Sequence, residues 1–109
     1  GNEVIYGGPG NDVIDGSWGD EVINGGPGDD QIKTGGGNAV LLYGKNWGHD
    51  TVNMDCRGSV VALIFSKEIS KDDLVWSEKS LEDPRTHSKI TFSGSTQCLQ
   101  TIYSKESFS

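Results

Sequence analysis

The sequence lacks the long apolar runs and the basic patches by which many proteins bind membranes or nucleic acids. No run of about 18 apolar residues occurs, and a membrane-spanning helix needs at least that many. The 16 acidic residues outnumber the 9 lysines and arginines and give a net charge of −7. This acidity argues against nucleic acid or an anionic membrane as a direct partner. The chain also begins without the charged and apolar regions of a signal peptide.

Groups that could carry out catalysis are also sparse. The two histidines, His49 and His87, are isolated in the sequence, and no nucleophile has an evident general base beside it. We therefore expect no enzymatic activity. The two cysteines are Cys56 and Cys98. The sequence cannot show whether they lie close together, so a disulfide and two separate thiols both remain open.

Glycine is abundant, and most of the 16 glycines fall in a nine-residue repeat. The stretch GGPGNDVID, residues 7–15, is followed by units that start at Gly16, Gly25 and Thr34. A looser copy, KNWGHDTVN, covers residues 45–53 and is shifted by two residues. A flexible glycine linker would not keep an aliphatic residue at every ninth position. The sequence does so at Ile5, Ile14, Ile23, Ile32 and Leu41.

Each unit combines a tight turn with a very short strand. The first six residues, such as 7–12, contain the glycine, proline, asparagine and aspartate that favour turns. The last three residues, such as 13–15, suit a strand. Two units therefore make one coil of eighteen residues, with two turns and two strands. Stacked coils predict an all-β fold, namely a parallel β-roll with the aliphatic residues inside.

The repeat resembles that of the repeat-in-toxin (RTX) family, also called hemolysin-type, whose unit is G-G-x-G-x-D-x-U-x with U apolar. The resemblance covers about the first half of the chain and implies that the repeats bind calcium. Ca²⁺ takes about six to eight oxygen ligands from carboxylates and carbonyls. Asp12 and Asp30 are eighteen residues apart, so both should face one ion. The family pattern adds carbonyl ligands at Gly8, Gly10, Gly25 and Pro27.

The resemblance also implies a second ion on the same side of the coils. One half of its ligands would come from the turn that ends at Asp30, and the other half from the turn that ends at Asp50. The two residues of shift in the last copy separate these turns by twenty residues instead of eighteen. The ligands implied for this second ion are Gly26, Gly28, Asp30, Lys45, Trp47 and Asp50.

The opposite side of the coils departs from the pattern, because its aspartate slots hold Glu3, Glu21 and Ala39. Glutamate has one more methylene than aspartate and pushes its carboxylate into the space meant for the ion. Alanine supplies no ligand. We therefore expect one competent calcium side and one weak or empty side. The candidate ligands on the weak side are Glu3, Ser17, Gly19 and Glu21.

The second half has a different composition, since the regular glycines stop near Ser59. The apolar run SVVALIFS, residues 59–66, predicts a buried strand, another strand is expected at 74–77, and residues 89–103 predict a hairpin around Gly94. The region resembles the one that follows the repeats in exported RTX proteins. We expect the repeats at residues 1–54 and a β-rich cap at 55–109. The cap should close the open end of the roll and cover its more apolar face, which carries Val4, Tyr6, Val22, Val40 and Leu42.

The negative charge is concentrated in the repeats. Up to Met54 there are eight acidic residues and two lysines, so −6 of the total −7 lies in this half. Without calcium, the charge, the glycines and the thin core should leave the repeats largely disordered. The free energy of calcium binding would then drive folding. Extracellular calcium modules typically work at about 10⁻⁴ to 10⁻³ M.

The resemblance implies that the chain is a calcium-binding module of a larger, secreted bacterial protein of toxin type, exported by type I secretion and folded outside the cell. The sequence starts inside a repeat, which suggests a part of a longer protein. We expect a monomer whose partners are calcium ions and, through the parent protein, the secretion machinery. Two alternatives stay open: a calcium-stabilised adhesion or glycan-binding module, and an accessory module of an exported enzyme.

Overall fold

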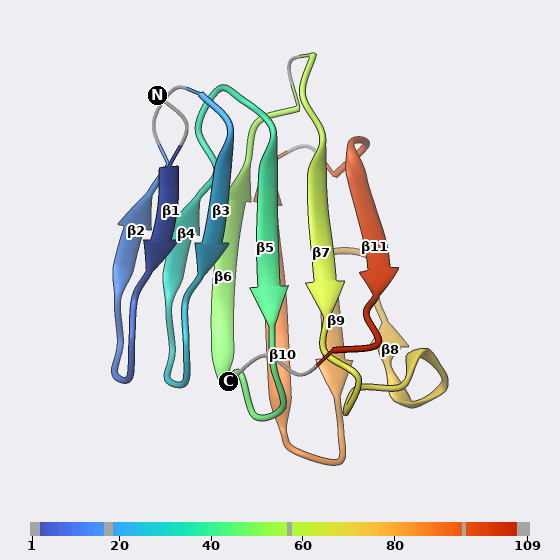
Figure 1. Ribbon diagram of the computed structural model, residues 1–109. Helices are drawn as coiled ribbons and strands as arrows, with labels where there is room; N and C mark the ends of the chain where they lie inside the picture. Colours follow the sequence, from blue (N-terminus) through green and yellow to red (C-terminus); the bar gives the residue numbers. More distant parts are fainter. Residues whose placement is uncertain (1–2, 17–18, 57, 95, 107–109) are drawn as a thin grey trace.

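The computed structural model describes residues 3–16, 19–56, 58–94 and 96–106 (Figure 1). Within these residues the chain forms β-strands and one short 3-10 helix, η1 (Lys71–Asp73). The prediction of an all-β fold is confirmed. The described residues contain no helix of the length and apolarity that a membrane crossing requires.

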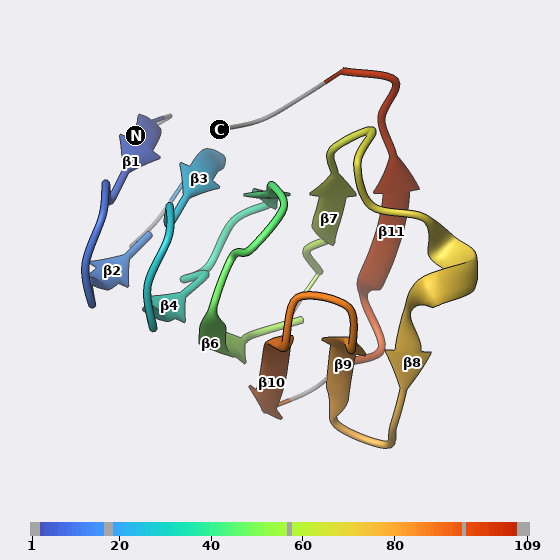
Figure 2. The same cartoon turned by 90° about the horizontal axis from the view of Figure 1, so that it is seen from below.

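The strands form two sheets that face each other as two layers (Figure 2). The five-stranded sheet has the order β1 (Glu3–Tyr6), β3 (Glu21–Asn24), β5 (Ala39–Tyr43), β7 (Val61–Phe65) and β11 (Leu99–Tyr103). The six-stranded sheet has the order β2 (Val13–Asp15), β4 (Gln31–Lys33), β6 (His49–Met54), β10 (Ser88–Gly94), β9 (Ser80–Asp83) and β8 (Val75–Trp76). The first sheet is parallel throughout. The second is mixed, because β9 pairs antiparallel with both β8 and β10.

In the first half, the chain alternates between the two sheets, so that each coil adds one strand to each of them. Val13 of β2 pairs with Gln31 of β4, eighteen residues later. Gln31 pairs with Thr51 of β6, so the next coil is longer by two residues, as the shifted last copy predicts. Glycine is required where successive coils touch. Gly28 has a φ of +113°, and a Cβ there would lie 2.2 Å from the carbonyl oxygen of Gly10.

The second half lengthens both sheets at one end. β7 pairs with β5, β10 with β6, and β11 with β7, all in parallel. The strand predicted at residues 59–66 contains β7, and the one at 74–77 contains β8. The hairpin predicted around Gly94 is wrong, because β10 and β11 belong to different sheets. The alternating pattern on both sides of the glycine was correct for strands but could not show that the chain crosses between the layers.

The outer face of the five-stranded sheet is not covered near β1. Val4 is 83% exposed and Tyr6 is 58% exposed. The prediction that the second half covers this face is therefore wrong. Its strands instead add to the sheet edges, where the backbone groups of β5 and β6 need partners. The division into a repeat unit at residues 1–54 and a cap at 55–109 stays a prediction.

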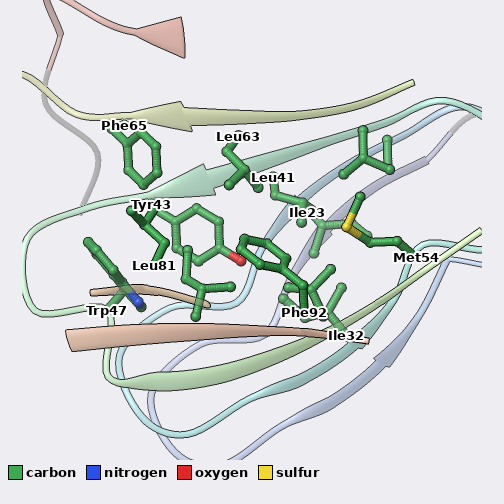
Figure 3. Close-up of a cluster of buried hydrophobic side chains, with 14 of the residues drawn as sticks. Ile23, Ile32, Leu41, Tyr43, Trp47, Met54, Leu63, Phe65, Leu81 and Phe92 are labelled. Carbon is green, nitrogen blue, oxygen red and sulfur yellow. The ribbon is translucent and has the colours of Figure 1, made fainter. Parts of the chain in front are cut away.

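The apolar side chains between the two sheets form one core (Figure 3). The aliphatic ladder of the repeats is confirmed, since Ile14, Ile23, Ile32 and Leu41 are buried and Ile5 packs against them. Towards the second half the core becomes aromatic. The rings of Tyr43, Trp47 and Phe65 lie within 6 Å of one another, with centroid distances of 5.5, 5.8 and 5.9 Å.

A disulfide joins Cys56 and Cys98, with an S–S distance of 1.97 Å. It links the segment that follows β6 to the segment that precedes β11. Of the two alternatives that the sequence left open, the structure therefore has the disulfide.

Candidate metal centre

Three aspartates stack along one side of the coils, which we call the aspartate side. The backbone N–H of Asp12 donates to Oδ1 of Asp30 over 2.9 Å. The N–H of Asp30 in turn donates to Oδ1 of Asp50 over 3.0 Å. The eighteen-residue spacing thus brings the predicted carboxylates into one column, with Asp30 in the middle.

Two carboxylates of this column have an oxygen turned into the protein. Oδ2 of Asp12 and Oδ2 of Asp30 are buried and have no hydrogen-bond partner among the described residues. Asp30 is 1% exposed, and Asp50 is also buried. Burying a charged group without a partner is strongly unfavourable. The column therefore calls for a positive ion or a proton beside these oxygens.

The pKa values of Asp30 and Asp50 also indicate that their negative charges are unfavourable in this position. Burial raises the pKa of Asp30 to about 6, and the neighbouring charges of Asp12 and Asp29 add to the shift. Burial raises the pKa of Asp50 to about 8, and the charges of Asp30 and Asp29 act in the same direction. The hydrogen bonds from backbone N–H groups lower both pKa values but do not outweigh burial. A bound cation would take the place of these protons.

Glycines leave room for the carboxylates at the turns. A Cβ on Gly25 would lie 2.6 Å from Oδ2 of Asp30, and one on Gly7 would lie 2.8 Å from Oδ2 of Asp12. The same position at Gly7 is 2.8 Å from the carbonyl oxygen of Gly25. A carboxylate oxygen and a predicted carbonyl ligand therefore approach one point. Because glycine has no side chain, these two positions leave space for an ion beside the carboxylates.

The other predicted carbonyls lie along the stack of turns. The carbonyl oxygen of Gly8 is 2.6 Å from the Cβ position of Gly26, and that of Gly10 is 2.2 Å from the Cβ position of Gly28. Because a side chain would collide there, only glycine allows the turns to stack so closely. The structure thus brings the predicted glycines of both turns together beside the aspartate column.

A cavity of about 240 Å³ between the turn of the second coil and that of the third overlaps part of the second predicted site. Its lining includes four ligands predicted for the second ion, namely Gly26, Lys45, Trp47 and Asp50. It also includes Gly25 and Pro27, which were predicted for the first ion, whereas Gly28 and Asp30 are not among the lining residues. It also includes Tyr43, which the sequence did not single out. The ring of Trp47 is buried and packs on Tyr43 and Phe65, so the indole is part of the core and not of the surface.

The donor set suits a hard cation. Within the described residues, no group of three or more histidine, cysteine, aspartate or glutamate side chains is placed to hold a metal. A site here must therefore combine one or two carboxylates with backbone carbonyl oxygens. Such an all-oxygen shell is typical of Ca²⁺ and unlike the nitrogen and sulfur ligands of zinc. The residues of the aspartate side fit calcium.

The opposite side, which holds Glu3, Glu21 and Ala39, contains a buried carboxylate that the sequence did not predict. Glu21 is 2% exposed, and both of its carboxylate oxygens lack a hydrogen-bond partner among the described residues. Burial, and then the charge of Glu3, raises its pKa. Glu3 itself is exposed, and Ala39 is buried in the core. The weaker calcium binding of this side stays a prediction, but Glu21 alone makes it a second place that favours a cation.

The other two predicted ligands on this side are Gly19 and Ser17, and the structure describes only Gly19. Gly19 has a φ of +106°, and its carbonyl oxygen lies against Gly37 of the next coil, 1.9 Å from the Cβ position there. This stacking matches that of the glycines on the aspartate side. The candidate Ser17 lies outside the described residues.

The polar residue before each aspartate slot has a role that the sequence did not reveal. Oδ1 of Asn11 accepts from the N–H of Asp29, and Oδ1 of Asp29 accepts from the N–H of His49, at 2.8 and 3.0 Å. On the other side, Asp20 and Asn38 make the equivalent bonds to the next coil. The residue types in this slot favour turns, and their side chains also tie successive coils together.

Comparison with protein families finds a match for the repeats. The model of the RTX calcium-binding nonapeptide repeat, four copies long, matches residues 1–32 and 15–44. The matched residues include Asp12, Asp30 and Glu21 and end before Asp50. No curated protein matches the sequence.

Proposed function

We propose that β1 to β6 form a parallel β-roll that folds when calcium binds, because residues 1–44 match the model of the RTX calcium-binding nonapeptide repeat. The second half continues both sheets of this roll and closes the end beyond the third coil. The proposed ligands are those of the aspartate side, with one ion between Asp12 and Asp30 and one between Asp30 and Asp50. The glutamate side is proposed to bind calcium more weakly.

The observation that carries this proposal is the column of buried carboxylates with unpartnered oxygens. In the absence of cations, Asp12, Asp30 and Asp50 repel one another and lose their hydration on folding. Calcium would remove both penalties at once, since it replaces water and neutralises the charges. A ligand that binds the folded state and not the unfolded state stabilises the folded state by mass action. Calcium binding and folding should therefore be one event.

This coupling suits a module of a larger exported protein of toxin type. The chain would stay unfolded at the low calcium concentration of the cytosol and pass through a type I secretion system. It would fold outside the cell, where calcium is abundant, and thereby support the folding of the parent protein. We propose a monomer that acts through calcium, without a catalytic role and without binding nucleic acid.

A calcium titration followed by far-UV circular dichroism tests the proposal. We expect a cooperative change from coil to β-structure at about 10⁻⁴ to 10⁻³ M calcium, the range of extracellular modules. Magnesium serves as the control and should not substitute, because it requires near-octahedral geometry and keeps its waters. A chain that is fully folded in chelator would contradict the proposed switch and would make calcium only a local clamp.

The second half offers an observation that favours the alternative of glycan binding. Trp76 on β8 is 47% exposed, and its ring stacks on Phe92 with an interplanar angle of 11°. Beside it lies a cavity of about 310 Å³, whose lining includes Ser77, Glu78 and Thr101. An exposed indole with nearby hydroxyl and carboxylate groups can stack on a sugar ring and bind its hydroxyls.

A pull-down on insoluble polysaccharides tests this second candidate. The calcium-loaded protein should be retained, and the variant Trp76→Ala should lose about tenfold or more in affinity, because aromatic stacking and its buried area are removed. Val75→Ala is a matched control, since Val75 is a neighbouring exposed residue on β8 outside the cavity lining. Equal retention of wild type and Trp76→Ala would rule out this site as the binding surface.

A further inference from the structure

Residues that occupy the same position in successive coils form a row across the five-stranded sheet. One such row changes from glycine to aromatic residues at the third coil, where the aspartate column also ends. Tyr6 pairs with Asn24, and Ile23 pairs with Leu41. Continuing this register places Gly7, Gly25 and Tyr43 in successive positions of one row. In the first two coils these glycines leave room for the carboxylates of Asp12 and Asp30. In the third coil, a large side chain stands in the same place.

Tyr43 brings a polar atom into this buried space. The residue is 2% exposed, and its hydroxyl is buried without a hydrogen-bond partner among the described residues. The ring lines the cavity between the second and third turns, together with Asp50. A tyrosine hydroxyl has an ordinary pKa of about 10, so it keeps its proton at neutral pH and is a donor.

The cavity thus holds a hydroxyl donor without an acceptor, and the carboxylate of Asp50 belongs to the same lining. Nε1 of Trp47, which also lines the cavity, is a second buried donor without a partner among the described residues. A buried donor is normally paired, and one that is not indicates an absent partner. The carboxylate of Asp50, which lines the same cavity, is an acceptor of the kind required.

We propose that Tyr43 is a positioning residue for the calcium site between the second and third turns, where its hydroxyl donates to the carboxylate of Asp50. This inference rests on the proposed function, since it requires an ion at Asp30 and Asp50. The hydroxyl fixes the orientation of the carboxylate, which leaves the other oxygens of Asp50 and Asp30 to the ion. The glycines of the first two coils cannot do this, so the site differs from the one between Asp12 and Asp30.

The same side chain connects the ion to the second half of the protein. The ring of Tyr43 is 5.5 Å from that of Trp47 and 5.8 Å from that of Phe65, measured between centroids (Figure 3). Phe65 in turn stacks on Tyr103 of β11 at 5.5 Å. Calcium at this site should therefore order the aromatic residues that join the repeats to β7 and β11.

The variant Tyr43→Phe tests the proposal, because it keeps the ring and removes only the hydroxyl. Calorimetric titration with calcium should show affinity about tenfold weaker at one site and unchanged at the other, since a hydrogen bond to a charged group is lost. Tyr6→Phe is the control, because it makes the same chemical change at an exposed position and should bind calcium as the wild type does. Identical binding by Tyr43→Phe and wild type would overturn the proposal.

Two further measurements separate a positioning role from a merely structural one. In a double-mutant cycle, Tyr43→Phe should have no additional effect on calcium affinity once Asp50→Asn is present, because the two residues act together. Additive effects would contradict the proposal. The fluorescence emission of Trp47 can be measured alone in the variant Trp18→Phe with Trp76→Phe. It should change as calcium fills the site between Asp30 and Asp50. An emission that stays the same during the calcium titration would also contradict the proposal. If the wild-type protein binds no calcium at all, the proposed function is wrong. If the wild-type protein binds calcium but Tyr43→Phe binds it with the same affinity, only this inference is wrong.

Discussion

The variant Asp30→Asn should lose about 100-fold or more in calcium affinity and should no longer fold at millimolar calcium. Asp30 lies in the middle of the aspartate column, where it accepts from the N–H of Asp12 and donates its own N–H to Asp50. It is a proposed ligand of both ions, so one substitution weakens both sites. Asparagine keeps the size but removes the charge. Each lost interaction with a charged group costs about 1.5–3 kcal/mol, or about one to two powers of ten in affinity.

In chelator, the same substitution should have the opposite effect. Burial raises the pKa of Asp30 to about 6. A carboxyl whose pKa is higher in the folded state favours folding below its unfolded pKa, near 4, and loses that contribution as the pH rises past the folded value. At pH 8 and without calcium, the ionised carboxylate therefore opposes folding. Asp30→Asn removes this penalty, so any residual β-structure in chelator should increase, as measured by circular dichroism.

The controls for this prediction test both the charge and the side of the molecule. Asp15→Asn removes one negative charge from the exposed face of β2 and should leave calcium affinity within about twofold of wild type. Glu21→Gln removes the buried carboxylate of the opposite side and should have a smaller effect than Asp30→Asn. If Asp30→Asn binds calcium normally and Glu21→Gln does not, the functional ions lie on the glutamate side.

The repeat predicted the first half of the fold well, because strands that pair there are only one coil apart in the sequence. A slot that recurs every nine residues fixes which residue faces inward, and a coil of eighteen residues fixes which turns stack. These two facts alone predict the aliphatic ladder and put Asp12, Asp30 and Asp50 in one column. Even the two additional residues before β6 are visible in the shifted copy.

The second half could not be predicted in the same way, because its pairing depends on residues far apart in sequence. β10 lies beside β6, and β11 beside β7, although an alternating pattern around Gly94 resembles a hairpin. The residue pattern of neither strand indicates which of the two sheets it joins. The burial of both oxygens of Glu21 became visible only in the structure. The placement of Tyr43 in the glycine row could have been predicted, because Gly7, Gly25 and Tyr43 follow one another at the eighteen-residue spacing of the coils.

The register also shows why the aspartate column ends at Asp50. Asp50 pairs with Ile90 of β10, so the slot that holds aspartate in three coils holds an aliphatic residue in the next. On the opposite side, Glu21 pairs with Ala39, and Ala39 pairs with Val61. The same inward position thus changes from charged to apolar along the stack. We therefore expect the repeats to require ions between their turns, whereas the second half packs around an apolar core.

The disulfide should make the largest single contribution to stability in this second half. Cys56 and Cys98 are 42 residues apart in sequence. Closing a loop of this size lowers the entropy of the unfolded chain and stabilises the folded state by about 4 kcal/mol in the loop-closure model. That is a large share of the roughly 5–15 kcal/mol by which small domains are stable. The bond also holds the start of β11, which pairs with β7 along one edge only.

Urea unfolding in saturating calcium, with and without reductant, measures this contribution. Reduction, or the double variant Cys56→Ser with Cys98→Ser, should lower the free energy of unfolding by about 4 kcal/mol and shift the midpoint accordingly. Reductant should have no effect on the double-serine variant, which controls for other actions of the reagent. The calcium response of the repeats should persist, because Asp12, Asp30 and Asp50 lie outside the closed loop. An unchanged midpoint after complete reduction would mean that the pairing of β11 with β7 suffices to hold this end of the protein.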